Sequence, residues 1–95
     1  MLENISINEL RFINSNNIID IRDKEKYNQG HINGARNIPF MALLTNCEKY
    51  LVKSEKYYIY CQKGIRSSKI CQALFNKGYN VVNVSGGYDS LRAVD

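Results

Sequence analysis

Residues 56–67 have the sequence KYYIYCQKGIRS. The first five of these residues are aromatic, β-branched or lysine, a composition that favours a β-strand. The apolar residues between Ser67 and Lys77 have helical spacing, and Gly78 provides a C-terminal stop for that helix. The sequence therefore predicts a strand, a short loop and a helix in succession, with Cys61 at the end of the strand.

Further strands are predicted on both sides of this stretch. Short β-branched runs at residues 17–21 and 81–84 are too short for helices and indicate buried strands. Residues 37–39 resemble a brief extended segment. Strands that alternate with helices in units of this length predict an α/β fold, in which a parallel central sheet has helices on both faces.

Capping residues and apolar spacing predict the remaining helices. Residues 6–9, Ser-Ile-Asn-Glu, have the capping-box pattern, which predicts a short helix that ends near Asn14. Asp23 is placed to cap a second short helix that stops at Gly30. The apolar residues between positions 41 and 52 form a loose helical stripe, which predicts a third helix over that range.

Size and composition indicate one domain over residues 1–95, because a chain of this length with 44% hydrophobic residues has room for one core. The formal charge of +4 is scattered along the chain, which argues against nucleic acid and favours small anionic substrates. The first ten residues lack the apolar core of a signal peptide, and no apolar run approaches the roughly 20 residues of a membrane span. We therefore expect a cytoplasmic protein without membrane segments.

The chain has three cysteines, Cys47, Cys61 and Cys71. None lies in a CxxC pair or a Cys/His cluster, so neither a disulfide scaffold nor a metal site is expected, and no cofactor is implied. Cys47 and Cys71 are interpreted as packing residues. Because Cys71 lies on the helix that follows Cys61, a resolving thiol is the alternative interpretation of that residue.

The loop that starts at Cys61 has the features of an anion-binding cradle. In open α/β sheets, sites form where a strand leads through a loop into a helix N-terminus. Backbone amides and the helix dipole favour a negative charge there, and hence a thiolate. Gly64 permits the close backbone approach that a cradle needs, and Lys63 and Arg66 add positive charge. A free cysteine alone is more often a small buried hydrophobe, but this surrounding favours a nucleophile.

Three stretches together resemble the rhodanese family. The first contains Ile18-Ile19-Asp20-Ile21-Arg22 and continues, through Tyr27, to residues 30–39, GHINGARNIP. The second runs from Cys61 to Ser67. The third is Asn83-Val84-Ser85-Gly86-Gly87-Tyr88, which is similar to the closing motif of the family. These stretches span most of the chain in the order that the family has.

The resemblance implies a three-layer rhodanese-like fold with Cys61 as the sulfur-accepting nucleophile. It further implies that the loop binds the substrate and the persulfide through Gln62, Lys63, Gly64, Ile65, Arg66 and Ser67. Asp20 and Arg22 match the Asp-x-Arg of the family and are expected to support the site by bonding to the backbone and to neighbouring loops. His31, within Gly-His-Ile, is similar to a structural turn of the family, and we do not expect it to act as the base for Cys61.

The activity implied is that of a thiosulfate sulfurtransferase, which moves sulfane sulfur from thiosulfate or a protein persulfide to a thiol or cyanide. One alternative is a regulatory interaction module that kept the fold, but Cys61, Gly64 and Arg66 together count against it. The other is phosphatase-like or arsenate reductase-like chemistry. Related phosphatases place five residues between cysteine and arginine, whereas this loop has four. Leu91 stands where many relatives have tryptophan, which is expected to remove part of a substrate wall.

Overall fold

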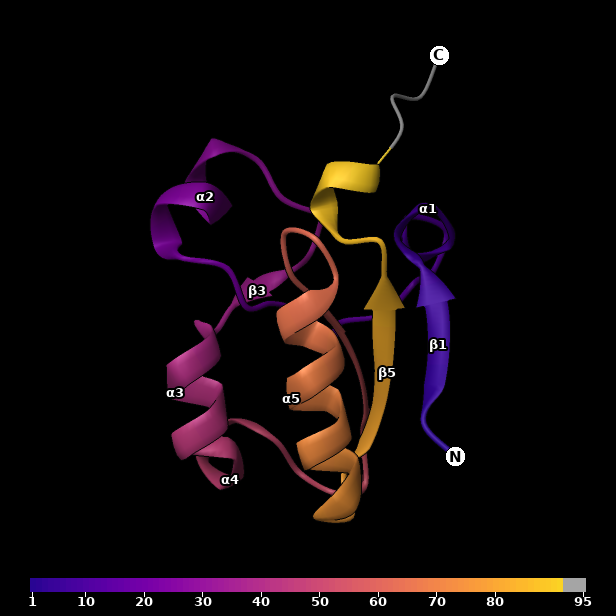
Figure 1. The fold of residues 1–95 in the computed structure, drawn as a ribbon, viewed down its shortest axis with the longest axis vertical. Helices are drawn as coiled ribbons and strands as arrows, with labels where there is room; N and C mark the ends of the chain where they lie inside the picture. The colour runs from indigo at the N-terminus through magenta and orange to yellow at the C-terminus, as the bar shows by residue number, and fades with distance from the viewer. Residues whose placement is uncertain (92–95) are drawn as a thin grey trace.

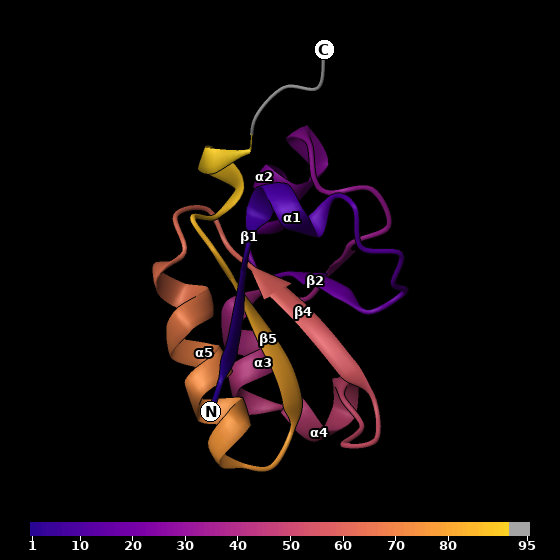
Figure 2. The same cartoon turned by 90° about the vertical axis from the view of Figure 1, so that its right-hand side faces the viewer.

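The computed structural model describes residues 1–91, which form a parallel β-sheet with helices on both faces (Figure 1, Figure 2). The strands are β1 (Glu3–Ser6), β2 (Ile18–Asp20), β3 (Arg36–Asn37), β4 (Lys56–Tyr60) and β5 (Asn80–Ser85). The helices are α1 (Ile7–Leu10), α2 (Lys24–Gln29), α3 (Phe40–Thr45), α4 (Cys47–Tyr50), α5 (Ile65–Asn76) and the 3-10 helix η1 (Tyr88–Ser90). In this described part of the chain, no helix is long and apolar enough to cross a membrane.

The five strands have the order β1-β5-β4-β2-β3, and every neighbouring pair is parallel. This places β4 at the centre, with Tyr60 opposite Asp20 of β2 and Ile59 opposite Asn83 of β5. The carboxyl ends of parallel strands lie at the same edge of a sheet. The segments that follow β2, β4 and β5 therefore meet at one edge, and the middle one of them begins with Cys61.

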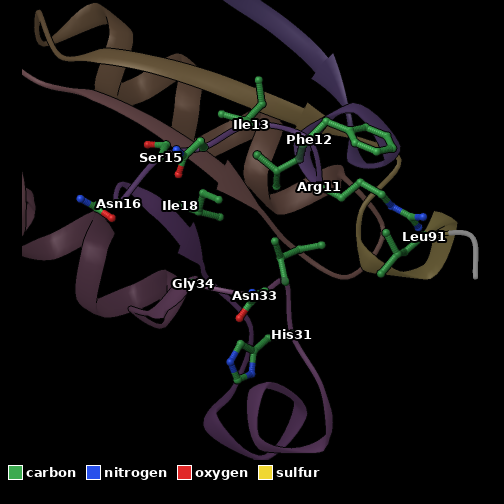
Figure 3. A pocket seen from close by; sticks show the side chains of 13 residues that line it. Arg11, Phe12, Ile13, Ser15, Asn16, Ile18, His31, Asn33, Gly34 and Leu91 are labelled. Carbon is green, nitrogen blue, oxygen red and sulfur yellow. The ribbon is translucent and has the colours of Figure 1, made fainter. Parts of the chain in front are cut away.

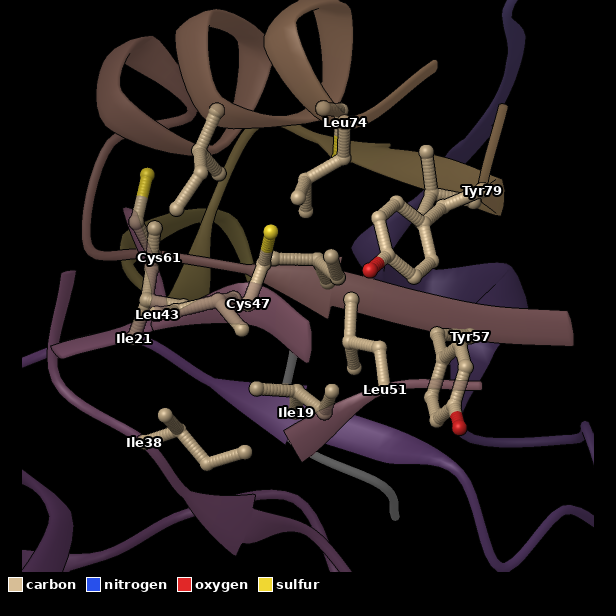
Figure 4. Packing of buried hydrophobic residues seen from close by; sticks show 14 residues of the cluster. Ile19, Ile21, Ile38, Leu43, Cys47, Leu51, Tyr57, Cys61, Leu74 and Tyr79 are labelled. Atoms are coloured by element: carbon tan, nitrogen blue, oxygen red, sulfur yellow. The ribbon is translucent and has the colours of Figure 1, made fainter. Parts of the chain in front are cut away.

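An apolar cluster covers each face of the sheet. On one face, Ile59 belongs to a cluster with Leu43 of α3 and Leu74 of α5. Figure 4 labels Leu43 and Leu74 in this cluster. On the other face, Tyr60 packs with Leu10 of α1. Ile59 and Tyr60 are consecutive in β4, so their side chains point to opposite faces of the sheet. Both are fully buried. The strand that leads to Cys61 is therefore held from both faces, as a parallel α/β sheet predicts.

The N-terminal part of the chain differs from the sequence-based expectation. The capping box is present, since Ser6 Oγ accepts a bond from the Glu9 amide at 3.1 Å and the Glu9 carboxylate accepts one from the Ser6 amide at 3.3 Å. However, α1 ends at Leu10 and not near Asn14. Strand β1 was not predicted, because Ile5 is its only apolar residue and the strand forms by pairing with β5 at the edge of the sheet.

The helix predicted over residues 41–52 is in fact two short helices, α3 and α4. Asn46 interrupts them, with φ −134° and ψ 39°, which are not helical values. The apolar stripe is also only partly buried. Leu43 and Leu51 are buried, whereas Met41 and Val52 are 60% and 50% exposed. Apolar spacing alone could not show where the backbone changes direction to follow the sheet.

Candidate active site

Cys61 follows the last residue of β4, and the loop to α5 folds around its sulfur. The Sγ atom accepts hydrogen bonds from the backbone N–H of Gly64 at 3.1 Å and of Ser67 at 3.3 Å. The thiol itself donates to Ser67 Oγ at 3.4 Å. Cys61 is only 5% exposed. Backbone amides directed at one atom favour negative charge on it, so this geometry suits a thiolate.

Gly64 allows the loop to turn so tightly. Its φ of +92° is in the left-handed region, which residues with a side chain rarely adopt, and it lies immediately before α5. A Cβ atom at this position would lie 3.0 Å from the backbone nitrogen of Gly86, which follows β5. The loop therefore packs directly against the turn that follows β5. Glycine at position 64 permits the positive φ and leaves room for this close contact.

A cavity of about 250 Å³ opens at the sulfur and is lined by Cys61, Gln62, Lys63, Ile65 and Arg66. Lys63 and Arg66 are exposed and have no ion-pair partner among residues 1–91. The Arg66 guanidinium lies 5.5 Å from the ring centroid of Phe40, which orients it by a cation–π contact. The cavity thus combines a cysteine with two cations.

The six loop residues predicted to bind substrate are therefore brought together around Cys61. Only Gly64 and Ser67 direct their amides at Sγ itself. Gln62, Lys63, Ile65 and Arg66 line the cavity without such a bond to the sulfur.

Asp20 and Arg22 form a buried ion pair beside this loop. Their closest atoms are 2.7 Å apart, and their side chains are 0% and 5% exposed. Asp20 also accepts a hydrogen bond from the hydroxyl of Tyr60 at 2.7 Å. Burial opposes the charge of Arg22, but the hydrogen bonds and attraction to Asp20 outweigh it and raise the pKa of Arg22. Burial and the Asp20 contact also raise the pKa of Tyr60, so the phenol remains a donor.

Arg22 connects the ion pair to two other segments. Its Nη1 donates to the side-chain oxygen of Gln62 at 3.1 Å, and its Nη2 donates to the carbonyl of Gly30 at 2.7 Å. The ring of Tyr88 covers the guanidinium, with 4.2 Å between Cζ and the ring centroid. One side chain therefore holds the Cys61 loop and the end of α2 in a fixed relation, as its planar fork of donors allows.

The turn after β5 is hydrogen-bonded to the Cys61 loop. The amide of Tyr88 donates to the carbonyl of Cys61 at 2.8 Å, and that of Asp89 donates to the carbonyl of Gln62 at 3.0 Å. The Gln62 side-chain amide donates to the Asp89 carboxylate. Gly87 has φ +68°, and a Cβ atom there would lie 2.6 Å from the amide nitrogen of Lys63. The two turns are in direct backbone contact.

The other candidate residues lie away from the sulfur. His31 stacks on Tyr27, with ring centroids 3.7 Å apart, and its Nδ1 is 2.8 Å from the Tyr27 carbonyl oxygen. It lines none of the cavities that Cys61 lines. Cys47 and Cys71 are free and buried within the core, as the packing interpretation predicts. Burial, followed by the proximity of Cys61, raises the pKa of Cys71 to about 12.

A larger cavity, of about 820 Å³, lies elsewhere, between residues 10–18, residues 31–34 and Leu91 (Figure 3). His31 and Leu91 are among its lining residues, but no cysteine is. Leu91 lines none of the cavities beside Cys61, so the structure does not place position 91 in the wall of this site. This cavity is larger than the one beside Cys61 but has no cysteine in its lining, so the position of the nucleophile, and not cavity volume, identifies the candidate site.

Sequence reasoning missed the residues that hold the loop from outside. Asp89 and the side-chain role of Gln62 were not predicted, although Asp89 directly follows the Gly-Gly-Tyr motif. Lys26 was not predicted either, and it lines a second cavity together with Cys61. An exposed lysine on a short helix carries no signal in the sequence, because only the fold brings it near the sulfur.

Comparison with known proteins adds to this geometry. A family model described as Rhodanese-like domain matches residues 7–93. The uncharacterized protein YqhL of Bacillus subtilis (strain 168) is 37% identical over 73 residues, which cover 75% of this chain and 56% of YqhL. The thiosulfate sulfurtransferase GlpE of Coxiella burnetii is 31% identical over 77 residues, which cover 80% of this chain and 71% of GlpE.

A solved structure agrees with the same fold. The crystal structure of SSP1007 from Staphylococcus saprophyticus matches with a TM-score of 0.86 and 37% identity, covering 96% of this chain and 94% of that chain. The match to YqhL spans little more than half of that relative.

Proposed function

Because this chain belongs to the rhodanese-like domain family, we propose that it is a sulfurtransferase that carries sulfane sulfur as a persulfide on Cys61. The geometry around Cys61 supports this most directly. Its sulfur accepts hydrogen bonds from two backbone amides, and Cys61 borders a cavity that is also lined by two cations. Amides and cations stabilise a thiolate and then the anionic persulfide that replaces it.

Loading begins when the Cys61 thiolate attacks the outer sulfur of an anionic donor such as thiosulfate. The new S–S bond forms as the S–S bond of thiosulfate breaks, and sulfite leaves with the electron pair. Cys61 then carries the persulfide, Cys–S–S⁻. The total charge stays at −3 throughout, and no proton moves. A preformed thiolate therefore needs no general base, and His31 has no part in this scheme.

Transfer follows when an acceptor thiolate, or cyanide, attacks the outer sulfur of the persulfide. The S–S bond to Cys61 breaks, and Cys61 leaves as a thiolate that the amides of Gly64 and Ser67 stabilise again. In this proposal the amides and side chains of residues 62–67 hold the outer sulfur, while Lys63 and Arg66 attract the donor. Asp20 and Arg22 support the loop and take no part in bond making. A protein persulfide is a further possible donor.

Mass spectrometry of the intact protein after exposure to thiosulfate tests the proposal. We expect one added sulfur atom, located on Cys61 and removed by cyanide. Cys61→Ser should lose both the adduct and the transfer, whereas Cys47→Ser and Cys71→Ser should keep them. Turnover by Cys61→Ser would contradict the assignment. Loss of turnover in a folded Cys71→Ser variant would instead make Cys71 a resolving thiol.

The same samples discriminate the two alternatives. An interaction module would show no sulfur adduct with any donor while retaining its fold. Phosphatase-like or arsenate reductase-like chemistry would instead hydrolyse an aryl phosphate or reduce arsenate, and the loop with four residues between Cys61 and Arg66 counts against both. The cytoplasmic location expected from the sequence remains a prediction.

A further inference from the structure

A groove lies between the Cys61 loop and α2 and adjoins the cavity proposed for the donor, with which it shares Cys61, Gln62 and Arg66. It consists of two adjoining cavities of about 190 and 220 Å³. Arg22, Lys26 and Gln62 line both of them, so the two cavities lie side by side. The nearer cavity includes Cys61, and the farther one ends at residues of α2 and at Tyr88. A molecule that reaches the sulfur along this groove passes Lys26.

The charges that line the groove leave a positive excess. Arg22 is neutralised by its ion pair with Asp20 at 2.7 Å. Lys26 and Arg66 remain, opposed by the single carboxylate of Asp23. Lys26 is exposed and forms no ion pair with any residue between 1 and 91, Asp23 included. Its ammonium group is therefore available to an anion in the groove.

The two walls of the groove are fixed with respect to each other. Arg22 bonds to the Gln62 side chain at 3.1 Å and to the Gly30 carbonyl at 2.7 Å. Gly30 follows the last residue of α2, the helix that carries Lys26. A buried guanidinium therefore holds the end of α2 relative to the Cys61 loop, while the Lys26 side chain itself is exposed. Fixed backbone on both walls favours selective binding.

We propose that Lys26 and this groove bind the acceptor and select thiols of peptide size that carry a carboxylate. The inference rests on the proposed function and names the acceptor class for the same site. The acceptor carboxylate lies at Lys26, and its thiolate attacks the outer sulfur of the Cys61 persulfide. The S–S bond to Cys61 breaks, Cys61 regains its thiolate, and the acceptor leaves as its own persulfide. Two negative charges, one on each reactant sulfur, are conserved.

Two acceptors that differ in one charge test this proposal. N-acetyl-Cys-Gly and its C-terminal amide have the same thiol and nearly the same length. The enzyme is first loaded with sulfur, and transfer to each acceptor is measured in a single turnover. The preference is the rate with the acid divided by the rate with the amide. Intrinsic differences between the two thiols cancel when this preference is compared between variants.

We expect the wild-type protein to prefer the acid and Lys26→Gln to lower that preference about threefold to fivefold, the range for one partly screened charge pair. Lys26→Glu should lower it further. Lys24→Gln is the matched control, because Lys24 is an exposed lysine of α2 that lines none of these cavities. Equal preferences in the wild type and Lys26→Gln would overturn the inference, as would a loss confined to thiosulfate loading.

A second measurement separates failure of this inference from failure of the proposed function. Bromoacetyl-glycine and bromoacetyl-glycinamide alkylate a thiolate directly and require no persulfide. In a protein with Cys47→Ser and Cys71→Ser, the ratio of their rates at Cys61 should again fall in Lys26→Gln and not in Lys24→Gln. If sulfur loading fails but this ratio responds, the groove selects anions and the sulfurtransferase proposal is wrong. If Lys26→Gln leaves this ratio unchanged, the groove does not select anions and the inference is refuted, whatever the result of sulfur loading.

Discussion

The three cysteines have the same side chain and are all buried, yet their surroundings differ. The sulfur of Cys61 accepts two backbone amides. The sulfur of Cys71 lies within the apolar cluster, where its hydrogen-bond partner is the carbonyl of Val82 at 3.9 Å. A carbonyl can only accept, so it stabilises the thiol and not the thiolate. Burial alone therefore does not distinguish the three cysteines, whereas the direction of the nearby dipoles favours Cys61 as the nucleophile that we propose.

The buried Cys71 thiol leads to a prediction about alkaline stability. Its pKa is raised from an ordinary value of 9.0 to about 12. Below pH 9 the thiol is protonated in both the folded and the unfolded state. As the pH rises from 9 to about 12, the unfolded state releases a proton that the folded state retains, so the free energy of unfolding falls.

Urea unfolding at a series of alkaline pH values measures this effect. The fall should be shallower in Cys71→Ala, although that variant is less stable at pH 7 because it leaves a small cavity. Cys47→Ala serves as a comparison for the loss of a buried thiol. Parallel pH profiles for the wild type and Cys71→Ala would contradict the prediction.

The sequence was most informative about residues whose role depends on near neighbours. The loop geometry at Cys61 and Gly64 could be predicted because a strand, a glycine and a helix start lie within a few positions. The Gln62–Asp89 contact could not, because it joins residues 27 positions apart. Lys26 is a similar case, since it lines a cavity together with Cys61 although the two residues are far apart in the sequence.

At the scale of elements, the contact between the Cys61 loop and the turn after β5 determines the shape of the site. Gly87 makes this contact possible, because any side chain there would meet the backbone of Gln62 and Lys63. Gly34 also has a positive φ, of +86°, but a Cβ atom there would meet nothing within 4 Å. Substitutions at these two positions therefore compare backbone strain alone, at Gly34, with backbone strain and a steric clash together, at Gly87.

We predict that Gly34→Ala loses about 1–2 kcal/mol of stability, the cost of a left-handed alanine, and still loads sulfur. Gly87 has φ +68° and ψ 178°, a region essentially restricted to glycine, so Gly87→Ala carries at least as much backbone strain. It should lose roughly 1–3 kcal/mol more, because the loop must also shift to accept the methyl group. Sulfur loading should fall with it. Urea midpoints and intact-mass measurements provide the two readouts. Normal loading by Gly87→Ala would show that the loop tolerates movement.

Elements differed in how well they could be predicted. Strand β4 has the bounds that its aromatic and β-branched residues indicate, because it is central and buried on both faces. Strand β1 lies at the edge, has one apolar residue, and is a strand only because β5 is beside it. The break between α3 and α4 likewise depends on packing and not on a helix-breaking residue.

At the scale of the whole molecule, the net charge of +4 bears on how the anionic donor that we propose would approach Cys61. Lys63 borders the cavity at Cys61, whereas Lys69 is exposed farther along α5 and lines none of the site cavities. Both substitutions to alanine lower the net charge by one. Attraction is screened over about 8 Å at physiological ionic strength, so position matters more than the total.

We predict that Lys63→Ala raises the KM for thiosulfate and flattens the dependence of the loading rate on salt, whereas Lys69→Ala changes both only slightly. Loading rates measured between low and moderate ionic strength test this. Equal effects of the two substitutions would mean that net charge acts as a whole. An unchanged salt profile in Lys63→Ala would place the donor elsewhere.

The pairing of β1 with β5 also determines when the sheet can be completed during synthesis. Asn4 and Asn83 are bonded through their side chains although 79 positions separate them. Of these five strands β1 emerges before the others, and it must therefore wait, unpaired, until β5 emerges. Until then β1 is unpaired and the edge of β4 that β5 will cover is open, and an open edge invites association with a neighbouring chain. In the completed sheet Glu3 of β1 and Lys56 of β4, the strands on either side of β5, are joined at 3.1 Å.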